Sequence, residues 1–152
     1  YGFSLGLNYK NWGLKANFQG VAHYSVWNTL ARVYRPLYGN DKSISRYYLE
    51  NRWTETTPNA RYPRLTTLSN NHNYQNSNLW MEKGDYLKLR VLELSYRLPT
   101  KLTEKMRMSD CRLFLKGMNL FSIDHIDIMD PEQINAEYPS SRSYLIGINV
   151  LF

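Results

Sequence analysis

The sequence predicts an all-β fold, namely a fragment of an antiparallel transmembrane β-barrel with long extracellular loops. Three observations support this: several segments alternate apolar with small or polar residues, the connections between them differ strongly in length, and aromatic residues gather at the segment ends. Tyrosine alone occurs 13 times, although the chain as a whole is polar with a mean hydropathy of -0.55. No apolar run approaches the ~20 residues of a membrane helix, so strands are the only elements that fit a membrane crossing.

The clearest alternation lies at the start of the chain. Tyr1, Phe3, Leu5, Leu7 and Tyr9 occupy the odd positions, with small or polar residues between them. After a turn near Lys10 and Asn11 the alternation resumes with Trp12, Leu14, Ala16 and Phe18. Two alternating runs joined by two to four residues predict a tight hairpin with one apolar face.

Three further segments follow the same rule. The last one places Tyr144, Ile146, Ile148, Val150 and Phe152 on one face. A middle segment changes parity between Leu89 and Leu92, which predicts a β-bulge near Arg90 and Val91. The predicted strands cover approximately residues 1–10, 12–22, 86–98, 111–121 and 143–152.

Connection lengths give the strands an orientation. The turn at Lys10 and the segment from Pro99 to Asp110 are short, and Leu102 and Met106 in that segment are expected to share one helical turn. Residues 23–85 and 122–142 form long connections at the opposite end. In outer-membrane barrels short turns face the periplasm and long loops face outside, so these two segments are predicted outer loops. Tyr9, Trp12, Tyr96 and Phe152 at the short-turn ends, and Tyr1 and Tyr144 at the long-loop ends, fit interfacial girdles.

Five strands cannot close a barrel, because the smallest such barrels use about eight. The membrane interpretation therefore requires further strands before Tyr1. A soluble β-sandwich that serves as a carbohydrate-binding module is the alternative. It differs in covering the apolar face with a second sheet instead of lipid.

Other classes of function find little support in the residues. The formal charge of +6 is spread along the chain and interrupted by acidic residues, which argues against nucleic-acid binding. Cys111 is the single cysteine and is read as a small strand residue. The three histidines lack metal-ligand spacing, the acidic residues from Asp124 to Glu132 lack the EF-hand pattern, and no catalytic motif occurs. We expect no enzyme activity, cofactor or metal.

Specific motifs add to this pattern. They are Asn51-Arg52-Trp53-Thr54, Pro58 to Leu65, Gly84 to Arg90, Gly117 to Phe121, and Arg142-Ser143-Tyr144 leading to Phe152. In this order and spacing they resemble the SusC/RagA family of TonB-linked outer-membrane transporters. The resemblance runs from about Asn51 to the end and covers the C-terminal portion of the barrel.

The resemblance implies about the last five strands of a 22-stranded barrel, with the plug and other N-terminal domains absent from this chain. It further implies import of oligosaccharides, glycans or peptides across the outer membrane of Bacteroidetes-type bacteria. The implied partners are a SusD-like surface lipoprotein, TonB through the absent N-terminal region, outer-membrane lipid and the cargo. Phe152 resembles the terminal aromatic signal for barrel assembly.

Candidate cargo contacts come from residue type. Sugars are held by aromatic faces, amides and guanidinium groups, and the first long loop is rich in them. The candidates are Trp53, Arg61, Tyr62, Tyr74 and Trp80. A short helix from Ser43 to Asn51, with Ser43 as its cap, is expected to pack beside them.

Overall fold

The computed structural model describes residues 1–29, 34, 36–37, 43–67, 72–127, 129–133, 138 and 140–152. They form two compact units. The first, here called the sheet unit, comprises Tyr1–Ala22, Asp85–Asp124 and Ser140–Phe152. The second, the loop unit, comprises His23–Gly84 and His125–Pro139.

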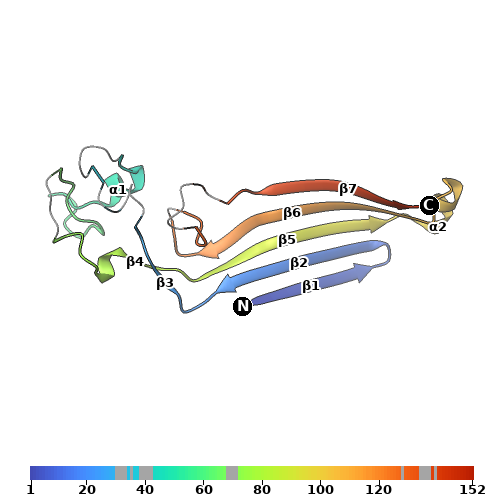
Figure 1. Cartoon of the computed structure of the whole chain (residues 1–152), viewed down its shortest axis with the longest axis horizontal. Coiled ribbons are helices and arrows are strands. Elements are labelled where there is room, and N and C mark those ends of the chain that lie inside the picture. The colour runs from blue at the N-terminus through green and yellow to red at the C-terminus, as the bar shows by residue number, and fades with distance from the viewer. Residues whose placement is uncertain are drawn as a thin grey trace. The chain divides into compact units, whose positions relative to one another are not determined.

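The sheet unit is one antiparallel sheet (Figure 1). Its strands are β1 (Gly2–Tyr9), β2 (Trp12–Val21), β5 (Tyr86–Arg97), β6 (Asp110–Asp124) and β7 (Ser143–Leu151). They are ordered β1-β2-β5-β6-β7, so β1 and β7 are the outer strands and the sheet is open. This confirms the all-β antiparallel prediction. The sandwich alternative needs a second sheet across one face, whereas the described residues of this unit form a single sheet.

The hairpin between β1 and β2 turns where the sequence predicts. Tyr9 pairs with Trp12, so Lys10 and Asn11 alone form the turn. The backbone of Lys10 has a φ of 52°, which lies in the left-handed region that residues other than glycine rarely adopt. The tight turn therefore fixes the register of the whole hairpin.

The predicted bulge is present in β5. The register between β5 and β6 shifts between Leu89 and Val91, and Asn119 on β6 has a φ of 53° at the same level. After the shift, Phe121 and Ile123 continue the apolar parity, and β6 extends to Asp124 rather than ending near Phe121 as predicted. The bulge thus restores the alternation on both strands.

A short helix, α2 (Thr100–Lys105), joins β5 to β6. Met106 is its C-cap, and the side chains of Leu102 and Met106 are both exposed. Thr103 is buried and donates a hydrogen bond to the carbonyl of Thr100 at 3.0 Å. The helix keeps this connection compact.

The loop unit contains short elements that the alternation does not predict. Strands β3 (Ser25–Trp27) and β4 (Met81–Lys83) form a two-stranded sheet, and a 3₁₀ turn, η2 (Asn78–Trp80), precedes β4. The helix α1 (Arg46–Asn51) is shorter than expected and begins after Ser45. The predicted cap at Ser43 is wrong, because the Ser45 hydroxyl accepts the hydrogen bond from the Tyr48 amide at 3.1 Å. Within the described part of the chain, no helix combines the length and apolarity that a membrane-spanning helix requires.

Candidate functional site

The two faces of the sheet differ sharply in chemistry. Register places the alternating apolar residues of all five strands on the same side, because nearly all of them pair with another apolar residue across the ladder; Tyr1 and Tyr144 lie opposite the glycines Gly20 and Gly117. Leu14, for example, pairs with Leu7 on one side and Leu94 on the other. This side, here called the apolar face, comprises Tyr1, Phe3, Leu5, Leu7, Tyr9, Trp12, Leu14, Ala16, Phe18, Leu87, Leu89, Leu92, Leu94, Tyr96, Cys111, Leu113, Leu115, Phe121, Ile123, Tyr144, Ile146, Ile148 and Val150.

Most of the apolar face is open. Leu5 is 56% exposed and Ile146 is 86% exposed, values far from those of a protein core. Soluble proteins rarely expose a contiguous apolar surface that spans a whole sheet, because its contact with water is unfavourable. The apolar face therefore requires an apolar environment.

Aromatic pairs mark this face. Trp12 and Tyr96 lie at the short-turn end, with ring centroids 4.7 Å apart and tilted by 51°. Further along, Phe3 and Phe18 stack at 4.7 Å. The Tyr1 ring crosses over Gly20, and its hydroxyl donates to the carbonyl of Tyr86 at 3.2 Å. A tyrosine whose ring lies on an apolar surface and whose hydroxyl reaches the backbone suits a membrane interface.

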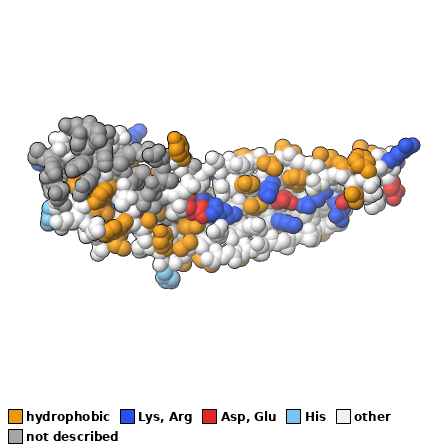
Figure 2. Space-filling model, viewed as in Figure 1, with side chains coloured by type: hydrophobic (Ala, Val, Ile, Leu, Met, Phe, Trp, Pro, Cys, Tyr) orange, Lys and Arg blue, Asp and Glu red, His pale blue; other side chains and the backbone are white. Residues whose placement is uncertain are grey.

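The opposite side, here called the polar face, carries charges in networks. Figure 2 shows basic and acidic side chains gathered along the strands on the side turned to the viewer. Glu93 pairs in register with Lys15 and Lys116 and forms an ion pair with Arg112. Where the bulge lies, Arg90 donates to the Gln19 side chain at 2.9 Å and to that of Asn119 at 3.1 Å. A sheet with one apolar and one charged face matches a barrel wall between lipid and an aqueous lumen.

An aromatic stack forms the core of the loop unit. Tyr48 stacks on Tyr62 at 5.1 Å, Tyr62 on Trp80 at 5.8 Å, and Trp80 on Tyr74 at 5.8 Å. The Tyr48 hydroxyl donates to the carbonyl of Pro63 at 2.9 Å, and the Trp80 indole donates to that of Asn73 at 2.9 Å. Burial raises the pKa of both Tyr48 and Tyr62 well above its ordinary value, because the buried site disfavours phenolate.

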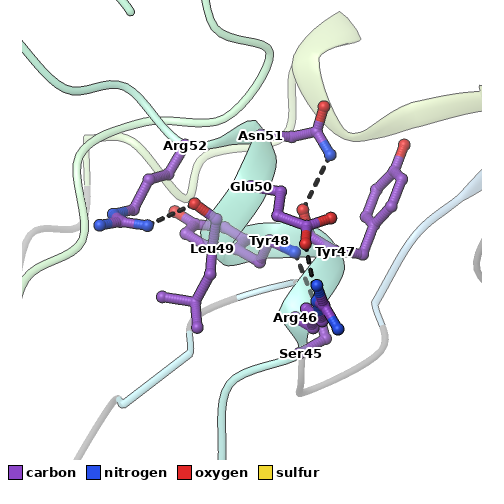
Figure 3. A network of polar contacts seen from close by, with 8 residues as sticks. All are labelled: Ser45, Arg46, Tyr47, Tyr48, Leu49, Glu50, Asn51 and Arg52. Atoms are coloured by element: carbon purple, nitrogen blue, oxygen red, sulfur yellow. Dashed lines mark hydrogen bonds and ion pairs between the residues drawn. The ribbon is translucent and has the colours of Figure 1, made fainter. Parts of the chain in front are cut away.

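Helix α1 holds one side of this core in place (Figure 3). The Asn51 amide donates to the Tyr47 carbonyl at 2.9 Å, and Arg46 forms an exposed ion pair with Glu50 at 2.7 Å. Beyond the helix, the Tyr62 amide donates to the carbonyl of Asn51 at 3.0 Å. Arg52, which follows the helix, forms an isolated parallel bridge with Tyr62, and together they position the aromatic stack.

The five candidate cargo residues divide into two groups. Tyr62, Tyr74 and Trp80 are buried in the aromatic stack and are at most 5% exposed, so in this structure they serve packing. Trp53 is 37% exposed and lines a shallow hollow of about 240 Å³. That hollow is lined by Arg52, Trp53, Thr54, Glu55, Arg64 and Leu65. Cargo contact by any of the five stays a prediction.

The side chain of Arg61 is partly exposed and forms an ion pair. Its guanidinium bonds the carboxylate of Glu82, which is only 7% exposed, and lies 5.5 Å from the centre of the Tyr62 ring. Burial lowers the pKa of Arg61, but the hydrogen bond and the charge of Glu82 outweigh it and leave that pKa raised. The sequence does not single out Glu82, because an acidic residue in a polar loop gives no sign of burial.

Phe152, the predicted assembly signal, lies just past the end of β7 and is 87% exposed. Its role in assembly remains a prediction. Among the described residues, no group of three or more histidine, cysteine or acidic side chains is placed to hold a metal ion. Cys111 is buried in β6, where Val150 is its register partner.

Comparisons with known proteins agree with this geometry. No family model matches the chain. The TonB-dependent receptor P3 of Formosa agariphila is 25% identical over 168 aligned residues, which cover 99% of this chain and 16% of that receptor. A structure of the RagAB peptide importer in its closed-closed state matches with a TM-score of 0.73 and 27% identity, covering 98% of this chain and 16% of that one. The importer in its open-open state matches with a TM-score of 0.72 and 25% identity, covering 99% and 17%.

This chain spans about a sixth of the length of these relatives. The match nevertheless covers nearly all of the chain, in sequence as well as in structure. The motifs from Asn51 onward, the two-faced antiparallel sheet and these likenesses all support assignment of the chain to the SusC/RagA family of TonB-dependent receptors.

Proposed function

We propose that the sheet unit forms five wall strands of an outer-membrane β-barrel whose whole receptor imports nutrients with energy supplied through TonB. The observation that carries this proposal is the apolar face, which presents exposed apolar residues from all five strands opposite a charged polar face. The similarity to a TonB-dependent receptor and to a peptide importer supports the same function. In this role the chain is part of a transporter and not an enzyme.

The remaining wall must come from other strands of the receptor. Among the residues that the structure describes, the outer strands β1 and β7 each have one edge without a neighbouring strand. An unpaired backbone edge in lipid lacks hydrogen-bond partners and is strongly unfavourable. We propose a closed barrel of about 22 strands, of the plugged class.

The connections give the proposed wall its orientation. The two-residue turn at Lys10 and the α2 connection lie at one end of the strands, and the loop unit joins the strands at the other end. By the usual pattern of these barrels, the loop unit then lies on the cell surface and the turns face the periplasm. The loop unit is the part of this chain that we propose to meet a SusD-like lipoprotein and incoming cargo.

Short peptides and oligosaccharides are the two cargo classes that we propose. The peptide class is supported by the likeness to the RagAB peptide importer, and the exposed Trp53 beside two guanidinium groups suits either class. In this proposal Trp53 contacts the cargo, and Arg61 acts mainly by fixing the loop that carries it.

Gene deletion combined with uptake tests the proposal. A strain that lacks the receptor carrying this chain is supplied with labelled short peptides or with labelled oligosaccharides, and cell-associated label is measured. We expect uptake of one class to be lost and to return when the gene is restored, and loss of TonB to have the same effect. Unchanged uptake of both classes would contradict import as the function.

A further inference from the structure

A hollow of about 380 Å³ lies at the short-turn end of the sheet unit. This volume falls within the ~300 to 1,000 Å³ of ordinary ligand sites. Its lining comes from β1, β2, β5, β6 and the β1–β2 turn, and it contains four cations, two asparagines and a serine. The lining residues are Asn8, Lys10, Asn11, Trp12, Gly13, Lys15, Ser95, Arg97 and Arg112.

Gly13 contributes to the lining of this hollow and allows close packing of the polar side chains beside it. A Cβ at that position would lie 2.8 Å from the Ser95 hydroxyl oxygen and 3.2 Å from the Asn8 side-chain oxygen. The Ser95 hydroxyl instead donates to the Gly13 carbonyl at 3.3 Å. The missing side chain therefore lets the polar side chains of Asn8 on β1 and Ser95 on β5 approach the backbone of β2 closely.

The hollow concentrates positive charge. Arg97 and Arg112 are direct register partners on β5 and β6, an arrangement that destabilises a sheet when both partners carry the same charge. Each guanidinium has one carboxylate partner outside the lining: Asp110 lies 3.3 Å from Arg97, and Glu93 pairs with Arg112. Within the described part of the chain, Lys10 and Lys15 have no ion pair within 4.0 Å. Four cations against two carboxylates leave a net charge of +2 at the hollow.

The donors of this hollow fit a carboxylate. Guanidinium groups bind carboxylates in a forked geometry, and lysine, amide and hydroxyl donors complete such a site. The hollow opens on the polar face, which lies inside the wall if the proposed function holds, and the lumen of a large barrel of this kind is filled by polypeptide. We propose that the hollow binds the carboxylate of an aspartate or glutamate on a polypeptide segment lying against the polar face. This inference rests on the proposed function and adds a docking site at the periplasmic end of the wall.

Zero-length cross-linking of the whole receptor in outer-membrane vesicles tests the proposal. A carbodiimide joins a lysine amine only to a carboxylate in direct contact with it, and mass spectrometry identifies both peptides. We expect a cross-link from Lys15 or Lys10 to an acidic residue elsewhere in the receptor, and its loss in the K10Q/K15Q double variant. Lys101, an exposed residue of α2 outside the hollow, is the control and should react freely with an amine reagent.

Two outcomes would overturn the proposal. If Lys15 and Lys10 form no cross-link and acetylate as fast as Lys101, the hollow is open to solvent. If they form no cross-link but inorganic phosphate protects them, the hollow takes a free anion instead. The cross-link on the unaltered receptor does not depend on how the variants fold. Heat-modifiable migration in gels reports separately whether the receptor is a barrel, so failure of the proposed function is distinguished from failure of this site.

Discussion

Glu82 in the loop unit is a buried carboxylate that depends on one partner. Replacing Arg61 with alanine leaves that carboxylate without its guanidinium, which costs about 1 to 3 kcal/mol for a buried polar group and tends to the lower end here because solvent reaches Arg61. We expect amide hydrogen exchange in β4 and around Tyr62 to speed up by about tenfold. Arg46→Ala is the matched control, because its ion pair with Glu50 is exposed and costs only about 0.2 to 0.5 kcal/mol. Equal effects of the two variants would contradict the role of Arg61.

Tyr48 and Tyr62 make the aromatic stack sensitive to alkaline pH. Their folded pKa lies above the ordinary 10.0, so their contribution to stability is complete below pH 10 and falls as the pH rises further. We expect the near-ultraviolet circular dichroism of the receptor to lose signal above about pH 10, and the Y48F/Y62F variant to lose less of it. A variant that loses signal identically would place the alkaline transition elsewhere.

Trp53 is the residue that tests cargo contact most cleanly. Trp53→Ala removes an exposed ring without opening the buried stack, so we expect weaker uptake at low cargo concentration and an unchanged amount of receptor in the membrane. Leu79→Ala is the control, since Leu79 has the same 37% exposure in the same unit. Uptake that falls equally in both variants would argue for a general effect on the loop unit.

At the scale of the strand, neighbouring residues should respond oppositely to the same substitution. Leu5 lies on the apolar face of β1 and Ser4, which pairs with the uncharged Asn17, on the polar face. An arginine in contact with lipid costs about 2 to 4 kcal/mol near the bilayer centre, whereas a lumen position accepts charge. We therefore expect Leu5→Arg to reduce the amount of heat-modifiable barrel in the outer membrane, and Ser4→Arg to leave it near the normal level. Equal assembly of both variants would mean that Leu5 does not face lipid.

The long strands could be predicted from the sequence, whereas the short strands and the contacts between strands could not. Alternation fixes which side of each strand is apolar, and the parity change at Leu89 locates the bulge, because both are local properties of the backbone. The short β3 and β4 have only three residues each, too few to show an alternation. Arg97 and Arg112 lie opposite one another, and a hollow forms beside Gly13, because of the register between strands that are distant in the sequence. The sequence alone does not show this register.

In the loop unit, the sequence indicates which residue types could contact cargo, but it does not show which of these side chains are exposed. Trp53 and Trp80 look alike in the sequence, yet one lines the surface and the other is 2% exposed. Aromatic residues suit both packing and recognition, so only the fold separates the two uses. The helix cap illustrates the same limit on a smaller scale, since Ser43 and Ser45 are both acceptable residues and the backbone selects Ser45.

For the whole molecule, the chain comprises two compact units, a two-faced sheet and a loop unit with an aromatic core. The central claim is that lipid covers the apolar face. To test it, the receptor carries a single spin label at one position of β1 at a time and is reconstituted in lipid. The measurement is the collision rate of each label with oxygen and with a water-soluble nickel complex. We predict that labels at residues 3, 5 and 7 meet oxygen preferentially, while labels at residues 4, 6 and 8 do not. Accessibility without this alternation, or nickel contact at both sets of positions, would contradict the claim.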